Sequence, residues 1–322
     1  MEGSGKKLIV VCGPTAGGKS DFALALSHAF GGEMVAADSM QIYRGLAVGT
    51  AALLPEEAGG IPQHCVGFLP PEVSYSAAEY VADARRAMGS IWARGRLPVV
   101  CGGTGLYVRA LVEGVAFSEE KPSPALRAQL QADWEAQGPD AMLARLAQCD
   151  AAHADRLHLR DKKRILRALE LCETTGLTEA ERAALSRAAA PPYTSLCIGL
   201  MPATREQLYV RINARAEHML QNGLLEEARL VYQNRDSYKT AAQAIGYKEF
   251  FPYFEGTSTL ENCAEKLRQA TRNYAKRQLT WFRHMPQLHW LDAADPTALP
   301  TAEKWIRAFL ADGALPLLEK PV

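Results

Sequence analysis

The sequence predicts an α/β fold in which a parallel β-sheet with crossover helices is interrupted by an all-helical insertion. Three observations predict it. Short apolar runs alternate with helical stretches over the first hundred residues, and a glycine-rich loop at 13–20 joins the first apolar run to a helix. Residues 118–190 are rich in Ala, Leu, Arg and Glu and contain no strand-like run. With 322 residues, the chain is long enough for about two domains.

The first predicted elements are apolar runs bounded by turn residues, which indicate strands at 8–12, 33–37, 65–68 and 97–101. Two helices are predicted between these strands. The first runs from Ser20 to about Phe30 and is ended by two glycines, and the second covers 75–94. Beyond the insertion we expect a strand at 196–200, a long helix near 259–283 and a strand at 288–291. Another helix begins at the capping box formed by Thr204 and Gln207.

The predicted α/β core is therefore discontinuous, with residues 1–117 and 191–292 on either side of the helical insertion at 118–190. Proline-containing segments bracket the insertion at both ends. Residues 293–322 are predicted to form a C-terminal tail with a short helix.

Composition excludes several classes of protein. Hydrophobic residues make up 48% and charged residues 22%, which excludes collagen-like and wholly disordered chains. Lys and Arg number 36, as do Asp and Glu, so a nucleic acid must be bound by a local patch rather than by the net charge. Seven cysteines without a CxxC pair indicate neither a zinc site nor a disulfide framework. No export signal or membrane-spanning run is visible, and we expect a cytoplasmic monomer without a membrane partner.

The strongest chemical signal is a phosphate-binding loop, or P-loop. It matches G-x-x-x-x-G-K-[ST] between a strand and a helix, and its residues are Gly13, Pro14, Thr15, Ala16, Gly17, Gly18, Lys19 and Ser20. Backbone N–H groups, the helix N-terminus and the charge of Lys19 can hold a diphosphate or triphosphate. The Ser20 hydroxyl is the predicted ligand of a Mg²⁺ cofactor.

A carboxylate follows the second predicted strand. Asp38 lies where the carboxyl end of a parallel strand meets the P-loop edge of the sheet, although an Asp before Ser is also common in turns. The strand at 97–101 ends in Gly102, Gly103 and Thr104 without a carboxylate, which disfavours a motor-type ATPase.

Six segments together resemble the bacterial tRNA dimethylallyltransferases, also called tRNA isopentenyltransferases. They are GPTAGGKS at 13–20, DSMQIYRG at 38–45, GGTGLY at 102–107, DKKRILRALE at 161–170, AIGYKE at 244–249 and TRNYAKRQLTWFR at 271–283. The resemblance spans residues 8–291 in the family's order and spacing. The chain departs from it at Ala52, where Lys is frequent, and at Gly17, where Ser is common. The cysteine spacing shows no zinc finger of the kind that eukaryotic relatives carry.

The resemblance implies a P-loop NTPase-like fold and a reaction. The dimethylallyl group of dimethylallyl diphosphate is transferred to N6 of adenosine 37 in tRNAs that read codons beginning with U. The P-loop then holds the leaving diphosphate, and Asp38 accepts a proton from the weakly nucleophilic amine, which contributes about 10²–10⁴ in rate. Thr104 contacts the target nucleotide. Arg215, with Arg211 as the alternative, neutralises the diphosphate.

Contacts to the tRNA anticodon loop are expected from three groups of residues. Near the P-loop they are Asp38, Ser39, Met40, Gln41 and Thr104; in the insertion they are Lys163, Arg164, Ile165, Leu166 and Arg167; on the long helix they are Arg268, Arg272 and Lys276. Residues 266–284 hold six Lys or Arg and no Asp or Glu, which favours a basic stripe. Solvated helix faces with internal ion pairs are the alternative for both helices. Gln41 and Tyr43 either line the base pocket or pack.

Two other functions are compatible with the P-loop. A small-molecule P-loop kinase or an adenylate isopentenyltransferase would share the loop and Asp38 but would not need a basic surface. A non-catalytic nucleotide-dependent RNA-binding module would bind tRNA without releasing diphosphate.

Overall fold

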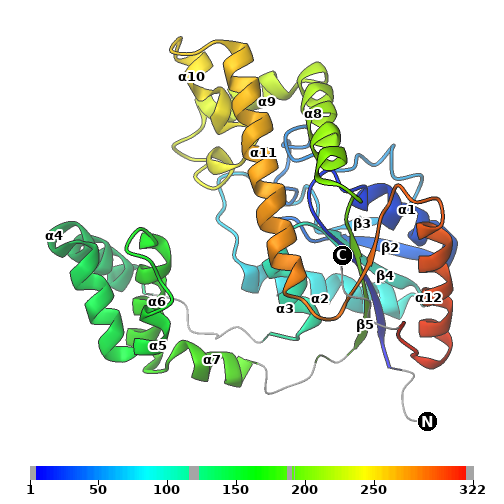
Figure 1. The fold of residues 1–322 in the computed structure, drawn as a ribbon, viewed down its shortest axis with the longest axis horizontal. Coiled ribbons are helices and arrows are strands. Elements are labelled where there is room, and N and C mark those ends of the chain that lie inside the picture. The colour runs from blue at the N-terminus through cyan, green and yellow to red at the C-terminus, as the bar shows by residue number, and fades with distance from the viewer. Residues whose placement is uncertain (1–4, 116–122, 187–190, 192, 317–322) are drawn as a thin grey trace. The chain divides into compact units, whose positions relative to one another are not determined.

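The computed structural model describes residues 5–115, 123–186, 191 and 193–316 (Figure 1). The chain divides into two compact units, one formed by Met1–Val112 with Pro192–Val322 and the other by Glu113–Pro191.

The larger unit is built on a six-stranded sheet with the order β3-β2-β4-β1-β5-β6, in which every pair is parallel. Its strands are β1 (Lys7–Cys12), β2 (Gly32–Ala36), β3 (Gln63–His64), β4 (Leu97–Gly102), β5 (Thr194–Leu200) and β6 (Leu288–Leu291). Leu8 to Cys12 are fully buried, which explains why this strand is a continuous apolar run rather than an alternating one. β5 pairs along the whole of β1, so the chain returns to the sheet after the insertion. The α/β prediction is confirmed.

The strand predicted at 65–68 is wrong. The strand here is β3, two residues long, and the chain turns directly after it. Cys65 has φ of 60° and Gly67 has φ of 58°. These left-handed conformations are incompatible with an extended strand, so the apolar residues at this point pack from a turn.

Helices pack against the sheet (Figure 1). They are α1 (Lys19–Phe30), α2 (Ala77–Ala93), α3 (Gly105–Val112) and α12 (Ala298–Asp312). α12 is a helix of 15 residues, and its buried face shares one core cluster with Ile9, Val11 and Phe22. The segment that the sequence set apart as a tail therefore contributes a helix to the core of the sheet.

A second core of the larger unit lies under the helices that follow β5. They are α8 (Arg205–Gln221), α9 (Leu224–Gln233), α10 (Phe251–Phe254) and α11 (Leu260–Arg283), with two 3₁₀ turns at Ala241–Gln243 and Lys248–Phe250. The predicted capping box at Thr204 is present and begins α8. Tyr247 and Phe250 are fully buried in this core, which also contains Ile42 and Tyr43.

Within the part of the smaller unit that the structure describes, every regular element is a helix. This unit contains α4 (Pro124–Cys149), α5 (Ala151–Ala154), α6 (Lys162–Thr175) and α7 (Glu179–Ser186). Gly138, with φ of 79° and ψ of 174°, kinks α4 beside Pro139. Leu146, Ile165 and Leu169 are fully buried in its own small core. None of the helices in the described parts of either unit is long and apolar enough to cross a membrane.

Candidate active site

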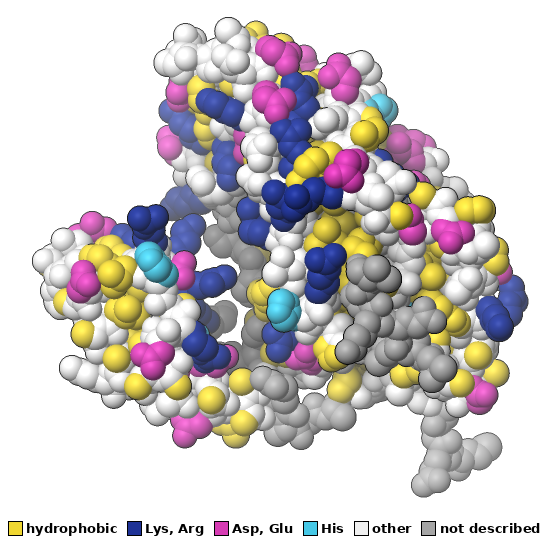
Figure 2. All heavy atoms as spheres, viewed as in Figure 1, with side chains coloured by type: hydrophobic (Ala, Val, Ile, Leu, Met, Phe, Trp, Pro, Cys, Tyr) yellow, Lys and Arg dark blue, Asp and Glu magenta, His cyan; other side chains and the backbone are white. Residues whose placement is uncertain are grey.

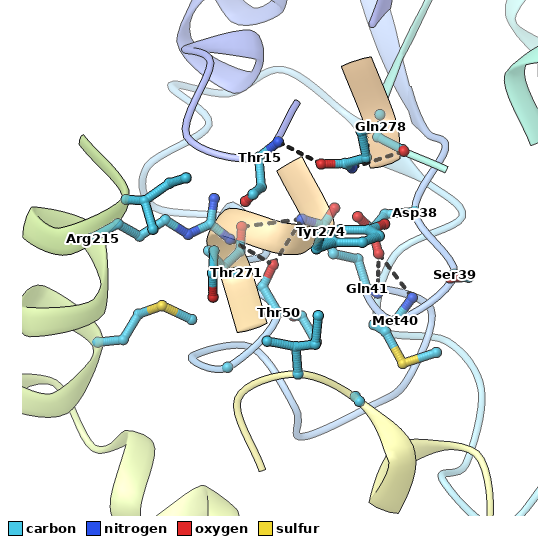
Figure 3. A pocket seen from close by; sticks show the side chains of 18 of the residues that line it. Thr15, Asp38, Ser39, Met40, Gln41, Thr50, Arg215, Thr271, Tyr274 and Gln278 are labelled. Carbon is cyan, nitrogen blue, oxygen red and sulfur yellow. Dashed lines mark hydrogen bonds between the residues drawn. The ribbon is translucent and has the colours of Figure 1, made fainter. Parts of the chain in front are cut away.

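A cavity of about 430 Å³ lies in the larger unit beside the carboxyl ends of β1, β2 and β4 (Figure 3). Its walls come from the P-loop, the turns after β2 and β4, the segment 49–51, α8, the segment 240–248 and α11. Segments that are far apart in the sequence thus meet at one site, at the edge of the sheet where ligands bind in parallel α/β folds.

The P-loop adopts the conformation that its glycines permit. Gly13 has φ of 146°, and a Cβ there would lie 2.2 Å from the carbonyl oxygen of Leu200. Gly18 precedes α1 with φ of 82°. Lys19 and Ser20 line the cavity from the first turn of α1, where the helix dipole favours an anion. The predicted strand–loop–helix context is therefore present.

Lys19 is held inside the loop. Its Nζ donates to the carbonyl oxygen of Pro14 at 2.7 Å. Burial lowers the pKa of Lys19, with a contribution from the nearby Arg215, whereas Cys101 and Asp38 raise it. A desolvated ammonium interacts strongly with an incoming anion because little water screens it.

Arg215 is the second cation of the cavity. It lines the wall formed by α8, and its guanidinium donates to the carbonyl oxygen of Thr50 at 3.4 Å. Burial lowers the pKa of Arg215, and the nearby Asp38 partly offsets this effect. Arg211, the alternative, is not among the residues that line the cavity.

Asp38 lines the cavity while it organises the turn after β2. Its Oδ1 accepts from the backbone N–H of Met40 at 2.8 Å and of Gln41 at 3.4 Å. Oδ2 has no hydrogen bond within the described residues, so the turn occupies only one oxygen of the carboxylate. The interpretation of Asp38 as a turn residue and its interpretation as a carboxylate of the site are therefore compatible.

Thr104 ties the turn after β4 to the turn after β2. The backbone N–H of Ser39 donates to Thr104 Oγ1 at 3.0 Å, and Thr104 Oγ1 lies 3.4 Å from Ser39 Oγ. The two turns are adjacent because β2 and β4 are paired up to Ala36 and Cys101. Gly102 and Gly103 line the cavity, whereas Thr104 stands one residue beyond them.

Gln41 and Tyr43 have different roles. Gln41 lines the cavity, and its side-chain amide donates to the carbonyl oxygens of Thr50 at 3.2 Å and Ala51 at 3.1 Å. Tyr43 is only 2% exposed and packs in the second core. Gln41 therefore shapes the pocket and Tyr43 supports it.

Hydrogen bonds to Glu227 hold the segment 48–50 in place. Its carboxylate accepts from the backbone N–H of Gly49 at 2.7 Å, from that of Val48 at 3.0 Å and from the hydroxyl of Tyr247 at 2.7 Å. A Cβ on Gly49 would lie 2.4 Å from the Tyr247 ring. The family-like segment at 244–249 thus lines the cavity with Ala244, Ile245 and Lys248, while its Tyr247 packs against the wall at 48–50.

Tyr247→Phe should lower the free energy of unfolding by about 1.5–3 kcal/mol, because a buried hydrogen bond to a charged carboxylate is lost while the ring stays in place. Urea denaturation followed by circular dichroism measures this. Tyr253→Phe is the control, since that residue lies at the edge of the same core. An equal effect of both substitutions would contradict the importance of the Glu227 contact.

Sequence reasoning missed the cavity residues of α11, among them Tyr274 and Gln278. Tyr274 lies beside Asp38 in Figure 3. Burial and the charge of Asp38 raise the pKa of Tyr274. Gln278 is 5% exposed; its Oε1 accepts from the backbone N–H of Thr15 at 2.8 Å, and its Nε2 donates to the carbonyl oxygen of Gly103 at 2.8 Å. The spacing of four residues was the available signal, since it places both on one helix face.

Lys and Arg side chains gather along α11 (Figure 2), but the predicted stripe is not uniform. Arg268 pairs with Glu261 at 2.7 Å and with Glu265 at 2.8 Å, and Arg272 pairs with Glu265 at 2.6 Å. Lys276 and Arg277 are exposed, and no ion pair holds either within the described residues. The intrahelical pairing considered as the alternative therefore applies to the first half of the helix.

The predicted contact residues of the insertion lie on α6. Lys163 and Arg164 are exposed, and Leu166 is partly buried. Arg167 pairs with the buried Glu170 at 2.6 Å. Ile165 is 0% exposed in the core of its unit, which corrects its assignment as a tRNA contact: it supports the helix that carries its neighbours.

Potential metal ligands are sparse. No cluster of three or more His, Cys, Asp or Glu side chains suited to a metal occurs among the described residues. Mg²⁺ is commonly bound by one or two protein oxygens together with the phosphates of a substrate. The Ser20 hydroxyl, beside Lys19 in the cavity, is such an oxygen.

A P-loop on a parallel sheet, with four cationic side chains (Lys19, Arg215, Lys248 and Arg277) and the Asp38 carboxylate around one cavity, defines the class as a P-loop-fold enzyme that acts on a phosphorylated substrate. Comparison with known proteins identifies the family within this class. The family described as "IPP transferase" matches residues 41–285, and "Isopentenyl transferase" matches residues 6–63.

The chain is 43% identical to a tRNA dimethylallyltransferase of Symbiobacterium thermophilum over 90% of this chain and 91% of the relative. It is 37% identical to the enzyme of that name from Bacillus subtilis over 97% of this chain and 98% of the relative. A crystal structure of a tRNA isopentenylpyrophosphate transferase from Bacillus halodurans superposes with a TM-score of 0.71 at 35% identity, covering 96% of this chain and 98% of that one. A eukaryotic dimethylallyltransferase acting on tRNA gives a TM-score of 0.85 at 28% identity, covering 98% of this chain and 82% of that one.

The chain belongs to the tRNA dimethylallyltransferase family, and it is a prenyltransferase with a P-loop NTPase-like fold. The small-molecule kinase is not supported by these relatives.

Proposed function

We propose that this protein transfers the dimethylallyl group of dimethylallyl diphosphate to N6 of adenosine 37 in tRNAs that read codons beginning with U. The products are N6-(dimethylallyl)adenosine and diphosphate. The observation that carries the proposal is the convergence of Lys19, Arg215 and Asp38 on one cavity beside the P-loop.

The P-loop side of the cavity holds the leaving group. When the allylic C1–O bond breaks, negative charge grows on the diphosphate. Lys19 and Arg215 are placed to stabilise this charge together with the N-terminus of α1. Because both cations are largely desolvated, their interaction with the developing charge is stronger than it would be in water.

Asp38 is the proposed general base. The exocyclic amine of adenine is a weak nucleophile because its lone pair is delocalised, so removal of its proton during attack lowers the barrier. The N6–C1 bond forms as the C1–O bond breaks, and the N6 proton passes to Asp38. Tyr274 and the turn after β4, with Thr104, flank the position of the base.

Mg²⁺ is the proposed cofactor, bound by Ser20 and the substrate diphosphate. When bound, it neutralises part of the diphosphate charge.

The target adenine must be turned out of the anticodon loop, and contacts to tRNA phosphates offset the cost of unstacking. Lys276 and Arg277 are the proposed phosphate contacts on α11, because both are exposed, Arg277 lines the cavity and Lys276 precedes it in the chain. Lys163 and Arg164 are the proposed contacts of the insertion. The turn formed by Ser39, Met40 and Gln41 would face the nucleotides next to the target.

Neutralisation of Lys276 and Arg277 together, each to Gln, should reduce the slope of log K against log salt for tRNA binding by about 1.5, because two phosphate contacts are lost. Arg268→Gln with Arg272→Gln is the matched comparison. We expect a smaller change there, since these guanidinium groups are bonded to Glu261 and Glu265. A larger change in the second variant would place the contacts on the first half of α11.

The direct test of the function is mass analysis of nucleosides from an anticodon stem-loop incubated with the protein, Mg²⁺ and dimethylallyl diphosphate. A mass gain of one dimethylallyl group on adenosine 37 supports the proposal. Stem-loop binding without release of diphosphate would instead favour the non-catalytic RNA-binding module. Prenylation of free adenylate but not of the stem-loop would favour the adenylate isopentenyltransferase. A cytoplasmic location and a monomeric state remain predictions, the latter testable by light scattering.

A further inference from the structure

We infer that Gln278 is a positioning residue for the transfer reaction: its side-chain amide holds the P-loop and the turn after β4 at a set spacing. The inference rests on the proposed function and adds a residue of α11 to it. Gln278 acts on the reaction through the two loops that it joins (Figure 3).

The sheet itself cannot supply this spacing. The pairing of β1 with β4 ends at Cys12 and Gly102, and beyond it one chain enters the P-loop while the other enters the turn. At this point Gln278 accepts from Thr15 N and donates to Gly103 O, both at 2.8 Å. A primary amide offers the same acceptor and donor as a peptide group. Gln278 therefore continues the hydrogen bonding between the two segments beyond the last paired residues of β1 and β4.

The side chain of Gln278 is tightly packed against Gly103 as well as hydrogen-bonded to it. A Cβ on Gly103 would lie 2.3 Å from Gln278 Nε2, whereas its next nearest atoms would be 3.5 Å away. Gln278 is 5% exposed; its bond to Gly103 O is buried and its bond from Thr15 N is partly buried, so losing these bonds leaves polar groups poorly compensated. The amide therefore sets the distance between two backbones rather than bridging a solvent-filled gap.

The consequence for the reaction follows from what each backbone carries. The P-loop holds the leaving group, and the turn after β4 leads through Thr104 to Ser39, next to Asp38. A change in the spacing misaligns the leaving group with the base. Misplacement of reacting groups by about 1 Å can cost on the order of 10² in rate.

Gln278→Met keeps the length of the side chain and removes both bonds. We expect kcat to fall by about 10² and the inhibition constant of inorganic pyrophosphate to rise, while the Kd for tRNA stays within about threefold of the wild type. Gln269→Met is the control, since Gln269 is exposed on the same helix and its side chain bonds only Asn273 and Arg272 among the described residues. A folded Gln278→Met protein with wild-type kcat and pyrophosphate inhibition would overturn the inference, even if its Tm were lower.

Gln278→Glu gives a second readout that does not depend on Gln278→Met being stable. A protonated glutamic acid can accept from Thr15 N and donate to Gly103 O as the amide does, and burial raises the pKa of a carboxyl group. The rate of this variant relative to the wild type should therefore increase as the pH falls from about 8 to about 6. A ratio that does not change with pH would contradict the inference.

The inference and the proposed function can fail separately. If the wild-type protein does not prenylate the stem-loop, the proposed function fails. Calorimetric binding of inorganic pyrophosphate to the wild type and to Gln278→Met still tests whether Gln278 orders the P-loop, and equal affinities would overturn that role.

Discussion

Asp38→Asn should reduce the single-turnover rate of prenyl transfer by about 10²–10⁴ without changing the affinity for tRNA. The asparagine side chain retains the oxygen that accepts from Met40 N and Gln41 N, so the turn after β2 is kept. It cannot take up the N6 proton, and only the general base is lost. The rate is measured by rapid quench with both substrates saturating, and the affinity by filter binding.

Asn is more informative than Ala at this position, because Ala would also remove the hydrogen bonds of the turn. Asp236→Asn is the matched control, since Asp236 is exposed after α9, away from the cavity. Wild-type rates in Asp38→Asn would show that another group takes the proton.

Lys19→Met should lower kcat/KM for dimethylallyl diphosphate by about 10²–10³, which is the usual effect of removing one preorganised donor to a developing negative charge. Methionine follows the lysine side chain as far as Cε and lacks only the ammonium group, so most of the buried volume beside Pro14 stays filled. The loss should appear mainly in kcat, because the charge on the diphosphate is greatest in the transition state.

Steady-state kinetics with varied dimethylallyl diphosphate separates kcat from KM, and Lys304→Met, on the exposed side of α12, is the control. An increase in KM alone would mean that Lys19 binds substrate and transition state equally well.

The local patterns were predictable. The P-loop is eight consecutive residues between a strand and a helix, and the capping box at Thr204 spans four, so short-range geometry alone defines them. The strand at 65–68 failed because a positive φ at a non-glycine residue such as Cys65 has no sequence signature, and the single glycine at 67 was the only local signal of a turn. The helix α12 was set apart because a hydrophobic face does not reveal which cluster it joins.

The site residues also divide into those that local sequence patterns or the resemblance predicted and those whose environment only the structure shows. Asp38 and Thr104 follow strand ends, and the resemblance pointed to Arg215; each lies at or beside the cavity. Arg268 and Arg272 carry the expected charge. Both form ion pairs with glutamates that lie just outside the acid-free stretch, Glu261 and Glu265. Side-chain pairing depends on rotamers and on neighbours one helical turn away, which a count of charges omits.

By itself, the sequence established the P-loop, the parallel α/β class, the helical insertion and the membership of the family, because each depends on residues close together or on a set of motifs in order. Only the tertiary structure showed that Gln278 joins Thr15 to Gly103 and that Glu227 fastens the segment 48–50. These contacts join residues 263, 175 and 178 positions apart. Their geometry exists only after the strands have paired and the helices have packed, so no local pattern records it.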